Sequence, residues 1–500
     1  MRAPERDSHR PSGSSGARTG ADPWWRDAVV YQVYPRSFRD SDGDGVGDLT
    51  GIIERLDYIA GLGVDAIWLS PIYPSPLADS GYDVSDHTGV DPALGSLDDV
   101  DRLLAGAHRR GLRVLLDLIP SHTSIEHPWF RRHPDWYVWS DRDGPQNNWR
   151  AAFGGPAWSR DDRTGRWYLH SFYPEQPDLD WRKAEVREAI ARVVRFWIER
   201  GIDGFRVDAA ERIAKDPELR DDPVANEPFP LPLHPEHGEL EHRHSRGFDQ
   251  AVAAMATLRE AAGDALLVGE VYMPTDRVHP YLECFDLVFS FELLHSRWDG
   301  AALAAAISPA AELGRVAWVL GNHDFPRIAS RVGRSGARLA AMLLLTLPGT
   351  AFVYQGDEIG MLDGPGGSPP RDRHGRDAHR HPMQWTPTAG GGFSTGDPWL
   401  PALDPEQASV AGQEGDPASL LELHRRLIAI RHELGRFELL DPADGAVAYR
   451  RGDHAVALNL TATEVPLPVR GEVAVATAPA AAEDGETLRP GHGVVLRAST

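Results

Sequence analysis

The chain has 500 residues, 41% of them hydrophobic, which is enough for a sizeable core and more than one average domain. Its formal net charge is −22, with 74 acidic against 52 basic residues. Because nucleic acids and anionic membranes are negatively charged, this surface argues against both as partners and suits a neutral or cationic small molecule. The single cysteine, Cys284, excludes an intrachain disulfide, and its apolar surroundings predict a buried side chain.

Residues 1–22 are charged and rich in Ser, Gly and Arg, which predicts a disordered tail. They contain no apolar run suited to a signal-peptide core, and no stretch of ~18 apolar residues occurs elsewhere. We therefore expect a cytoplasmic protein without a membrane-spanning segment. We also expect it to be a monomer or a small homo-oligomer.

Short apolar runs rich in β-branched residues alternate with helical segments, as expected for strands buried on both faces. A 3.6-residue apolar period marks the helical segment at 186–200. Eight such strands with helices between them predict a (β/α)8 TIM-type barrel. The predicted strands are 29–34, 66–69, 114–119, 204–207, 266–269, 285–289, 316–320 and 351–354.

Two gaps between elements are too long for simple helical crossovers. Residues 123–183, after the third strand, are rich in Trp, Asp, Gly and Pro and predict a small inserted domain. Residues 360–417, after the eighth strand, are rich in Gly and Pro and predict a rim loop. The barrel would then comprise residues 23–122 and 184–439. Strand-like runs punctuated by Gly and Pro predict a C-terminal antiparallel β-domain at 440–500.

Polar residues cluster directly after the predicted strand ends. They are His122 after the third strand, Arg206 and Asp208 at the end of the fourth, Glu270 after the fifth, and His323 and Asp324 after the seventh. In a TIM-type barrel these positions converge on the C-terminal mouth, where active sites lie. Solvated loop acids could explain one such motif, but four in register with the strands point to a site.

Close carboxylates flanked by hydrogen-bond donors suit glycoside hydrolysis. One carboxylate attacks the anomeric carbon, while the other protonates the leaving oxygen and then activates water. We expect Arg206, two residues from Asp208 on the same strand face, to lower the pKa of Asp208 and keep it ionised. The acid must hold its proton near neutral pH, and nearby negative charge raises its pKa.

At these motifs the sequence resembles the α-amylase superfamily of glycoside hydrolases, in particular its α-glucosidase and oligo-1,6-glucosidase branch. The resemblance runs from AVVYQVYPRSF (28–38) to PMQW (382–385). It also includes SGYDVSD (80–86), DLIPSH (117–122), QPDL (176–179), GIDGFRVDA (201–209), GEVY (269–272) and GNHDFPR (321–327). It implies that Asp208 is the nucleophile, Glu270 the acid/base and Asp324 the stabiliser of the transition state. It also implies that His122, Arg206 and His323 hold the reacting glucose.

The resemblance further implies a clamp on the non-reducing end of the substrate, which makes such enzymes exo-acting. Its members here would be Asp83 and Arg376, with Tyr82 as a stacking platform. Phe153 and Phe172 match aromatic positions that line the glucose pocket in relatives, and Arg327 of the GNHDFPR motif is a further candidate for substrate binding.

Ala209 follows the nucleophile position, beside the leaving-group subsite of the family. Relatives that favour α-1,6 links usually carry Val there, so Ala209 favours α-1,4 links, whereas the QPDL motif favours α-1,6 links. The resulting prediction is an exo-acting retaining α-glucosidase that releases glucose from α-1,4-linked disaccharides and short oligosaccharides through a covalent glucosyl-enzyme. Three alternatives remain open: an oligo-1,6-glucosidase, an α-glucosyl transferase or isomerase, and a non-catalytic relative.

The segment DSDGDGVGD places Asp40, Asp42, Asp44 and Asp48 at the spacing of the first nine positions of an EF-hand loop. The carbonyl of Val46 would take the seventh position, while the twelfth is Gly51 in place of Glu. An acidic solvated turn is the alternative. Relatives in the family bind one structural calcium here, so we expect a calcium ion and no organic cofactor.

A second stretch, with His234, His237, His242 and His244, could suggest a transition metal. Its irregular spacing and its Pro- and Glu-rich composition instead predict a solvated rim loop.

Overall fold

The computed structural model describes residues 23–226, 235–247, 249–441, 445–482 and 485–498. The predicted tail at 1–22 and His234 lie outside them. Eight parallel strands close into a barrel in the order β1-β10-β9-β8-β7-β6-β3-β2. They are β1 (Val29–Val33), β2 (Ala66–Leu69), β3 (Arg113–Leu118), β6 (Gly204–Val207), β7 (Leu266–Gly269), β8 (Leu287–Ser290), β9 (Val316–Val319) and β10 (Thr350–Tyr354). The predicted barrel fold and its eight strands are confirmed.

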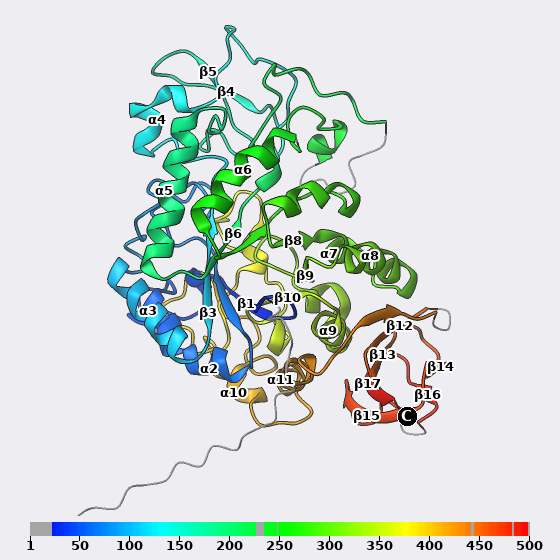
Figure 1. Cartoon of the computed structure of the whole chain (residues 1–500). Helices are drawn as coiled ribbons and strands as arrows, with labels where there is room; N and C mark the ends of the chain where they lie inside the picture. The colour runs from blue at the N-terminus through cyan, green and yellow to red at the C-terminus, as the bar shows by residue number, and fades with distance from the viewer. Residues whose placement is uncertain (1–22, 227–234, 248, 442–444, 483–484, 499–500) are drawn as a thin grey trace, which may run out of the picture.

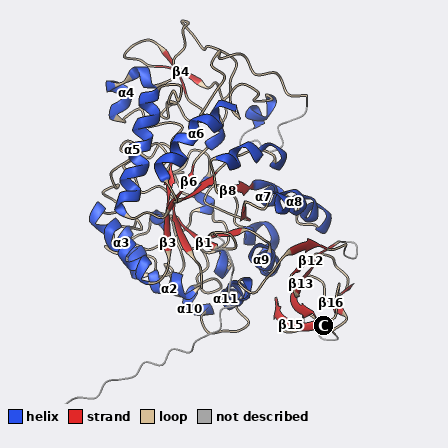
Figure 2. Cartoon of the chain, in the orientation of Figure 1, coloured by secondary structure: helices blue, strands red, loops and turns tan. Residues whose placement is uncertain are grey.

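The barrel strands are apolar on both faces because both faces are buried. On β1, Val30 packs inside the barrel with Trp68 and Phe352, while Val29 and Tyr31 pack outside it against the helical layer. This alternation explains why the strands appear in the sequence as continuous apolar runs. In Figure 2, α3 (Leu97–Arg109) and α5 (Ala184–Arg200) lie on one side of the barrel strands, and α8 (Gly300–Leu313) and α9 (Ile328–Thr346) lie on the other.

The helical layer and the short helices at the rim have these bounds: α1 (Leu49–Glu54), α2 (Leu56–Gly61), α3 (Leu97–Arg109), α5 (Ala184–Arg200), α6 (Asp249–Ala262), α7 (Phe291–His295), α8 (Gly300–Leu313), α9 (Ile328–Thr346), α10 (Val410–Gln413) and α11 (Leu420–Arg431). Local sequence sets their ends. Ser96 and Asp99 form a reciprocal capping box at the start of α3, and Gly201, at a φ of 107°, ends α5 in the left-handed conformation.

Two further units flank the barrel (Figure 1). Between β3 and β6 lie α4 (Pro128–Arg132) and the antiparallel pair β4 (Trp158–Arg160) and β5 (Trp167–Leu169). At the C-terminus, β11 (Phe437–Leu439), β12 (Ala446–Arg451), β13 (His454–Asn459), β17 (Gly493–Ala498) and β15 (Gly471–Ala476) form an antiparallel sheet, accompanied by the pair β14 (Val465–Pro466) and β16 (Thr487–Leu488). The predicted C-terminal β-domain is therefore confirmed as a fold, while the domain boundaries stay predictions.

Cys284 is buried, with 5% of its surface exposed, and its Sγ lies 3.3 Å from the carbonyl oxygen of Val252. The prediction of a buried side chain is confirmed. Among the described residues, no helix combines the length and the apolar character needed to span a membrane. The cytoplasmic location and the oligomeric state stay predictions.

Candidate active site

A pocket of about 130 Å³ opens at the C-terminal ends of the barrel strands. Its walls bring together Asp79, Tyr82, His122, Phe153, Phe172, Asp208, Ala209, Glu211, Arg212, Glu270, Tyr272, Asp324, Phe325, His374 and Arg376. All three predicted catalytic carboxylates are in this set. A larger hollow of about 380 Å³ lies elsewhere, beside Trp181, Lys215 and Ala253, and contains none of these three.

Arg206 is buried beneath the pocket and binds three carboxylates. Its guanidinium lies 2.7 Å from Asp208 and 2.8 Å from Glu270, and it also donates to Asp117 at 2.8 Å. The second carboxylate oxygen of Glu270 accepts from the backbone N–H of Ala209 at 3.0 Å. Because β6 and β7 are neighbours in the barrel, Asp208 and Glu270 face one guanidinium from adjacent strands.

Burial raises the pKa values of both Asp208 and Glu270, and Arg206 only partly offsets this rise. The negative charge of Glu270 further raises the pKa of Asp208. The expectation that Arg206 holds the pKa of Asp208 low is therefore corrected, because burial and the neighbouring carboxylates Glu270 and Asp117 outweigh the charge of Arg206. Such a pair binds one proton more readily than either group would alone in water.

Asp324, the third carboxylate, is held in its ionised form. Burial alone would raise its pKa, but His323, Arg376 and Arg380 together hold it well below its usual range. Arg376 donates to Asp324 at 3.1 Å and Arg380 donates to the same oxygen at 3.0 Å. The pocket thus contains two carboxyl groups with raised pKa values and one carboxylate with a lowered pKa.

Within the DSGYD segment, Arg376 pairs with Asp79, and the predicted pairing with Asp83 is corrected. Arg376 donates to Asp79, which also accepts from Gln176 at 2.8 Å. The carboxylate of Asp83 accepts from the hydroxyl of Ser75 and from the backbone N–H groups of residues 78 and 79. Asp83 therefore fixes the turn that presents Asp79 to the pocket.

Tyr82 lines the pocket, and its ring stacks on the buried ring of His323. Their ring centroids are 5.5 Å apart at an interplanar angle of 9°, and the hydroxyl of Tyr82 donates to Asp117 at 2.9 Å. Burial lowers the pKa of His323 to about 3, so its imidazole is neutral near pH 7. Gln32 Nε2 lies 2.8 Å from Nδ1 of His323, which leaves Nε2 of that ring to carry the proton.

His122, Phe153 and Phe172 form an aromatic part of the pocket wall. The rings of His122 and Phe172 lie 5.1 Å apart, and those of Phe153 and Phe172 lie 5.6 Å apart. Burial lowers the pKa of His122 to about 4, so it too is neutral near pH 7. These three residues are placed together as the sequence predicts.

Arg327 does not line the pocket, so its predicted role in substrate binding is corrected. Its guanidinium is fully buried, donates to the carbonyl oxygen of Gln355 at 2.7 Å and lies 4.5 Å from the ring centroid of Tyr354. It packs the start of α9 against the end of β10 and supports the segment that carries Asp324.

Several pocket residues were not predicted, namely Asp79, Glu211, Arg212, Tyr272, Phe325 and His374. Asp79 begins the DSGYD segment, four residues before the Asp that was chosen, so counting both acids of that segment would have found it. Glu211, Arg212, Tyr272 and Phe325 each follow a predicted catalytic residue by one to four positions. His374 lies in a loop without periodicity, and no sequence signal singles it out.

The His-rich segment is partly buried, which corrects the prediction of a solvated loop. His237 and His242 are at most 2% exposed, and their rings stack with centroids 3.8 Å apart. His244 lies 3.3 Å from Asp216. In the described ranges, the one cluster of potential metal ligands is the acidic loop at 40–48.

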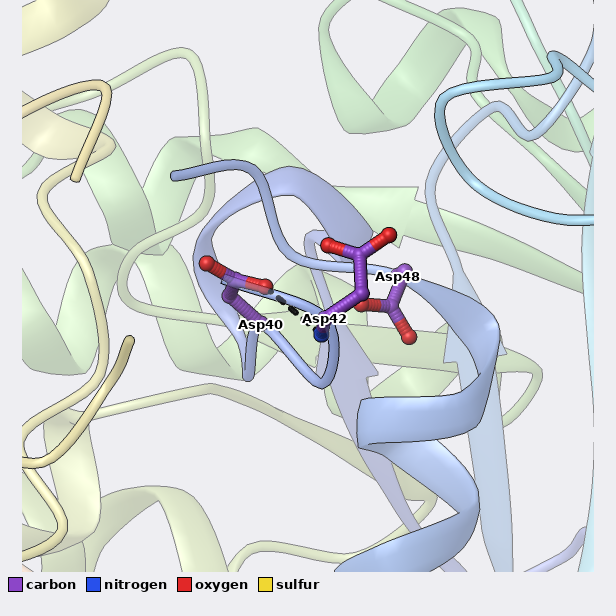
Figure 3. Close-up of side chains that lie close together, drawn as sticks. All are labelled: Asp40, Asp42 and Asp48. Atoms are coloured by element: carbon purple, nitrogen blue, oxygen red, sulfur yellow. Dashed lines mark hydrogen bonds between the residues drawn. The ribbon is translucent and has the colours of Figure 1, made fainter. Parts of the chain in front are cut away.

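In this loop, Asp40, Asp42 and Asp48 each place a carboxylate oxygen within 4.8 Å of the other two (Figure 3). A Ca²⁺ ion takes oxygen ligands at 2.3–2.6 Å, so ligands on opposite sides of one ion lie about 5 Å apart. Burial opposes the charge of Asp40, but hydrogen bonds from Ser394 and three backbone N–H groups lower its pKa and keep it ionised. These three residues therefore form a candidate site for the calcium ion that the sequence predicts. Asp44 lies outside the cluster, where its carboxylate accepts from the backbone N–H of Val46 at 2.7 Å.

We predict that calcium stabilises the fold through this loop without taking part in the chemistry. An ion that binds only the folded state contributes about 2.7 kcal/mol at a hundredfold excess over its Kd. Thermal melts with added calcium and with chelator should therefore differ in midpoint, and Asp42→Ala should remove the difference. Identical melting temperatures in calcium and in chelator would contradict the prediction.

A closed (β/α)8 barrel whose mouth holds paired carboxylates in a small pocket suits the cleavage of glycosidic bonds. The family of α-amylase catalytic domains matches residues 32–437. A protein of Rhizobium meliloti (strain 1021) named "Probable alpha-glucosidase" is 42% identical over 460 residues, which cover 82% of this chain and 82% of that protein. The oligo-1,6-glucosidase of Heyndrickxia coagulans is 34% identical over 492 residues, with 84% of this chain and 88% of that protein covered.

Solved structures show the same relationship. The α-glucosyl transfer enzyme XgtA superposes with a TM-score of 0.87 at 37% identity, over 95% of this chain and 100% of that chain. The trehalulose synthase MutB from Pseudomonas mesoacidophila MX-45 gives a TM-score of 0.84 at 31% identity over the same shares. The chain therefore belongs to the α-amylase family and is an enzyme, a glycoside hydrolase.

Proposed function

We propose that the protein is an exo-acting retaining α-glucosidase that releases glucose from the non-reducing end of α-linked disaccharides and short oligosaccharides. The observation that carries this proposal is the pair Asp208 and Glu270, held by Arg206 at 2.7 and 2.8 Å on adjacent strands of one pocket. Relatives named α-glucosidases and oligo-1,6-glucosidases support the substrate class.

In the first step, a carboxylate oxygen of Asp208 bonds to the anomeric carbon of the glucosyl residue as the glycosidic C–O bond breaks. Glu270 gives its proton to the leaving oxygen. Burial raises the pKa of Glu270, which suits an acid that must carry a proton before the first step. In the second step, Glu270 takes a proton from water, whose oxygen bonds to the anomeric carbon and releases Asp208.

Asp324 stabilises positive charge that develops on the sugar ring in both steps. Arg376 and Arg380 keep it ionised throughout, so no proton has to move to make this charge available. Preorganised charge of this kind contributes most in a site that excludes water.

The exo mode of action is supported by the pairing of Asp79 with Arg376 in the pocket wall. Arg376 also lies 5.2 Å from the ring centroid of Phe153 and donates to Asp372, so its guanidinium is fixed from several sides. A carboxylate and a guanidinium that share the terminal sugar hydroxyls would block extension of the chain beyond one glucose.

Transfer of the glucosyl group to a sugar is the second candidate function. It is favoured by the structural likeness to XgtA, described as an α-glucosyl transfer enzyme, and to the trehalulose synthase MutB. Both reactions share the covalent intermediate and differ in whether water or a sugar hydroxyl intercepts it.

A panel of four substrates separates hydrolysis from transfer: maltose, isomaltose, sucrose and trehalose. Each is assayed for free glucose and for transferred products. Hydrolysis predicts free glucose as the main product, and a dominance of new disaccharides would favour transfer.

Ala209 is the basis of a prediction on linkage. It lines the pocket, is 4% exposed and has a φ of 44°, and its N–H binds Glu270. We expect wild type to prefer maltose to isomaltose, and Ala209→Val to lower this preference. Pocket changes of this size are worth ~1–3 kcal/mol, or roughly 10–200-fold in kcat/KM.

Because β-branched residues are strained at positive φ, melting temperatures must accompany the kinetics of Ala209→Val. Ala209→Ser is a matched control that is polar but unbranched. A wild type that already prefers isomaltose would contradict the argument from Ala209.

A further inference from the structure

Glu211 and Arg212 form a charged wall of the pocket, directly after the strand that carries Asp208. They belong to the 3-10 helix η3 (Ala210–Arg212), and both are at most 3% exposed. A carboxylate oxygen of Glu211 accepts from the backbone N–H of Tyr272, two residues beyond Glu270. This wall therefore lies on the side of the acid/base. Because the acid/base protonates the leaving oxygen, this is the side on which the leaving group must lie.

Three neighbours fix the guanidinium of Arg212. One of its terminal nitrogens lies 3.0 Å from Nε2 of His237, and Nε lies 3.5 Å from the carboxylate of Glu211. Its carbon centre is 5.3 Å from the ring centroid of Phe172, which lines the same pocket. Since a guanidinium can only donate, the ring nitrogen of His237 must accept, so the imidazole is the neutral tautomer protonated on Nδ1.

His237 is itself fixed by contacts with His242. It belongs to the 3-10 helix η4 (Pro235–Glu239), and its ring stacks on His242, whose Nε2 lies within hydrogen-bond distance of the carbonyl oxygen of His237. His242 in turn lies 2.9 Å from the hydroxyl of Ser245. The buried residues His237 and His242 therefore hold Arg212 in place. This gives the His-rich segment a structural role outside the catalytic steps.

We propose that Arg212 is a specificity-determining residue, which donates hydrogen bonds to the hydroxyl groups of the sugar in the leaving-group position. His237 acts as its positioning residue. The site would then select glucosides whose leaving group is a second sugar over glucosides with an aryl leaving group, which lacks such hydroxyls. This inference rests on the proposed function and adds the chemical class of the leaving group to it.

Two substrates that share the glucosyl residue and differ in the leaving group test this directly: maltose and p-nitrophenyl α-D-glucopyranoside. Hydrogen bonds to a charged group are worth enough that Arg212→Met should lower kcat/KM for maltose about 10- to 100-fold, with no more than about a threefold change for the aryl glucoside. Arg212→Lys, which keeps a cationic donor, should fall between Arg212→Met and wild type for maltose.

Arg297→Met is the matched control, because Arg297 is an exposed arginine that pairs with Asp299 outside the pocket. If Arg212→Met does not fold in a thermal melt, His237→Ala replaces it. Releasing Arg212 should lower the maltose-to-aryl ratio of kcat/KM, and His237→Gln, which retains an acceptor, should restore it.

An equal loss on both substrates, or an unchanged maltose-to-aryl ratio in a folded variant, would overturn the role of Arg212 while leaving the proposed function intact. A wild type that releases no glucose from either substrate would overturn both. The two failures are therefore distinguishable in one set of assays.

Discussion

Asp208→Asn and Glu270→Gln should each abolish turnover of maltose while the fold survives. Loss of the nucleophile removes the covalent route, and we expect a fall in kcat on the order of 10⁴-fold or more. Loss of the acid/base should cost about 10²–10⁴-fold, the usual contribution of general acid–base catalysis. The measurement is steady-state kinetics on maltose, with circular dichroism to show that each variant is folded.

The two variants should also differ from each other. A glucosyl substrate with a good leaving group needs no proton, so Glu270→Gln should form the glucosyl-enzyme from such a substrate, whereas Asp208→Asn should not. Asp57→Asn is a matched control, since Asp57 is exposed and pairs with Arg110 on the outside of the barrel. Near-wild-type turnover of maltose by either active-site variant would show that the roles are assigned to the wrong residues.

Asp79→Asn should weaken the binding of maltose, so that KM rises and kcat/KM falls. Asp79 is buried against Arg376, and losing one member of a buried, hydrogen-bonded charge pair costs about 2–4 kcal/mol, or roughly 30- to 1,000-fold in kcat/KM. The measurement is kcat and KM for maltose in folded protein.

Asp83→Asn is the matched comparison, because the same chemical change is made four residues away. Its carboxylate binds the turn at residues 75–79, so the expected result is a lower melting temperature with KM of the folded protein close to wild type. A raised KM in Asp83→Asn together with an unchanged KM in Asp79→Asn would contradict this account. It would show that Asp83, as predicted from the sequence, binds the substrate together with Arg376, and that Asp79 does not.

The barrel could be predicted from the sequence because its strands are buried on both faces. Each strand appears as an uninterrupted apolar run, and the polar residues that follow it mark the C-terminal mouth. The observed strand ends differ from the predicted ends by at most two residues. The predicted strand at 285–289, for example, is observed as Leu287–Ser290. The carboxylates Asp208, Glu270 and Asp324 meet in one pocket because strand order alone places them there.

The remainder of the site depends on tertiary contacts that no local pattern encodes. The DSGYD segment contains two acids, and only the fold of its turn decides that Asp79 faces Arg376 while Asp83 binds backbone N–H groups. The pKa of Asp208 depends on Glu270 from the next strand as well as on Arg206. The polar composition of the His-rich segment predicts exposure, but stacking of His237 on His242 buries both rings.

The anomeric configuration of the first product tests the double displacement most directly. Proton NMR of maltose hydrolysis, recorded before mutarotation equilibrates the released glucose, identifies the anomer that forms. Two successive displacements at the anomeric carbon, by Asp208 and then by water, predict that α-glucose appears first and β-glucose grows in later. Initial formation of β-glucose would mean a single displacement by water and would contradict the covalent role of Asp208.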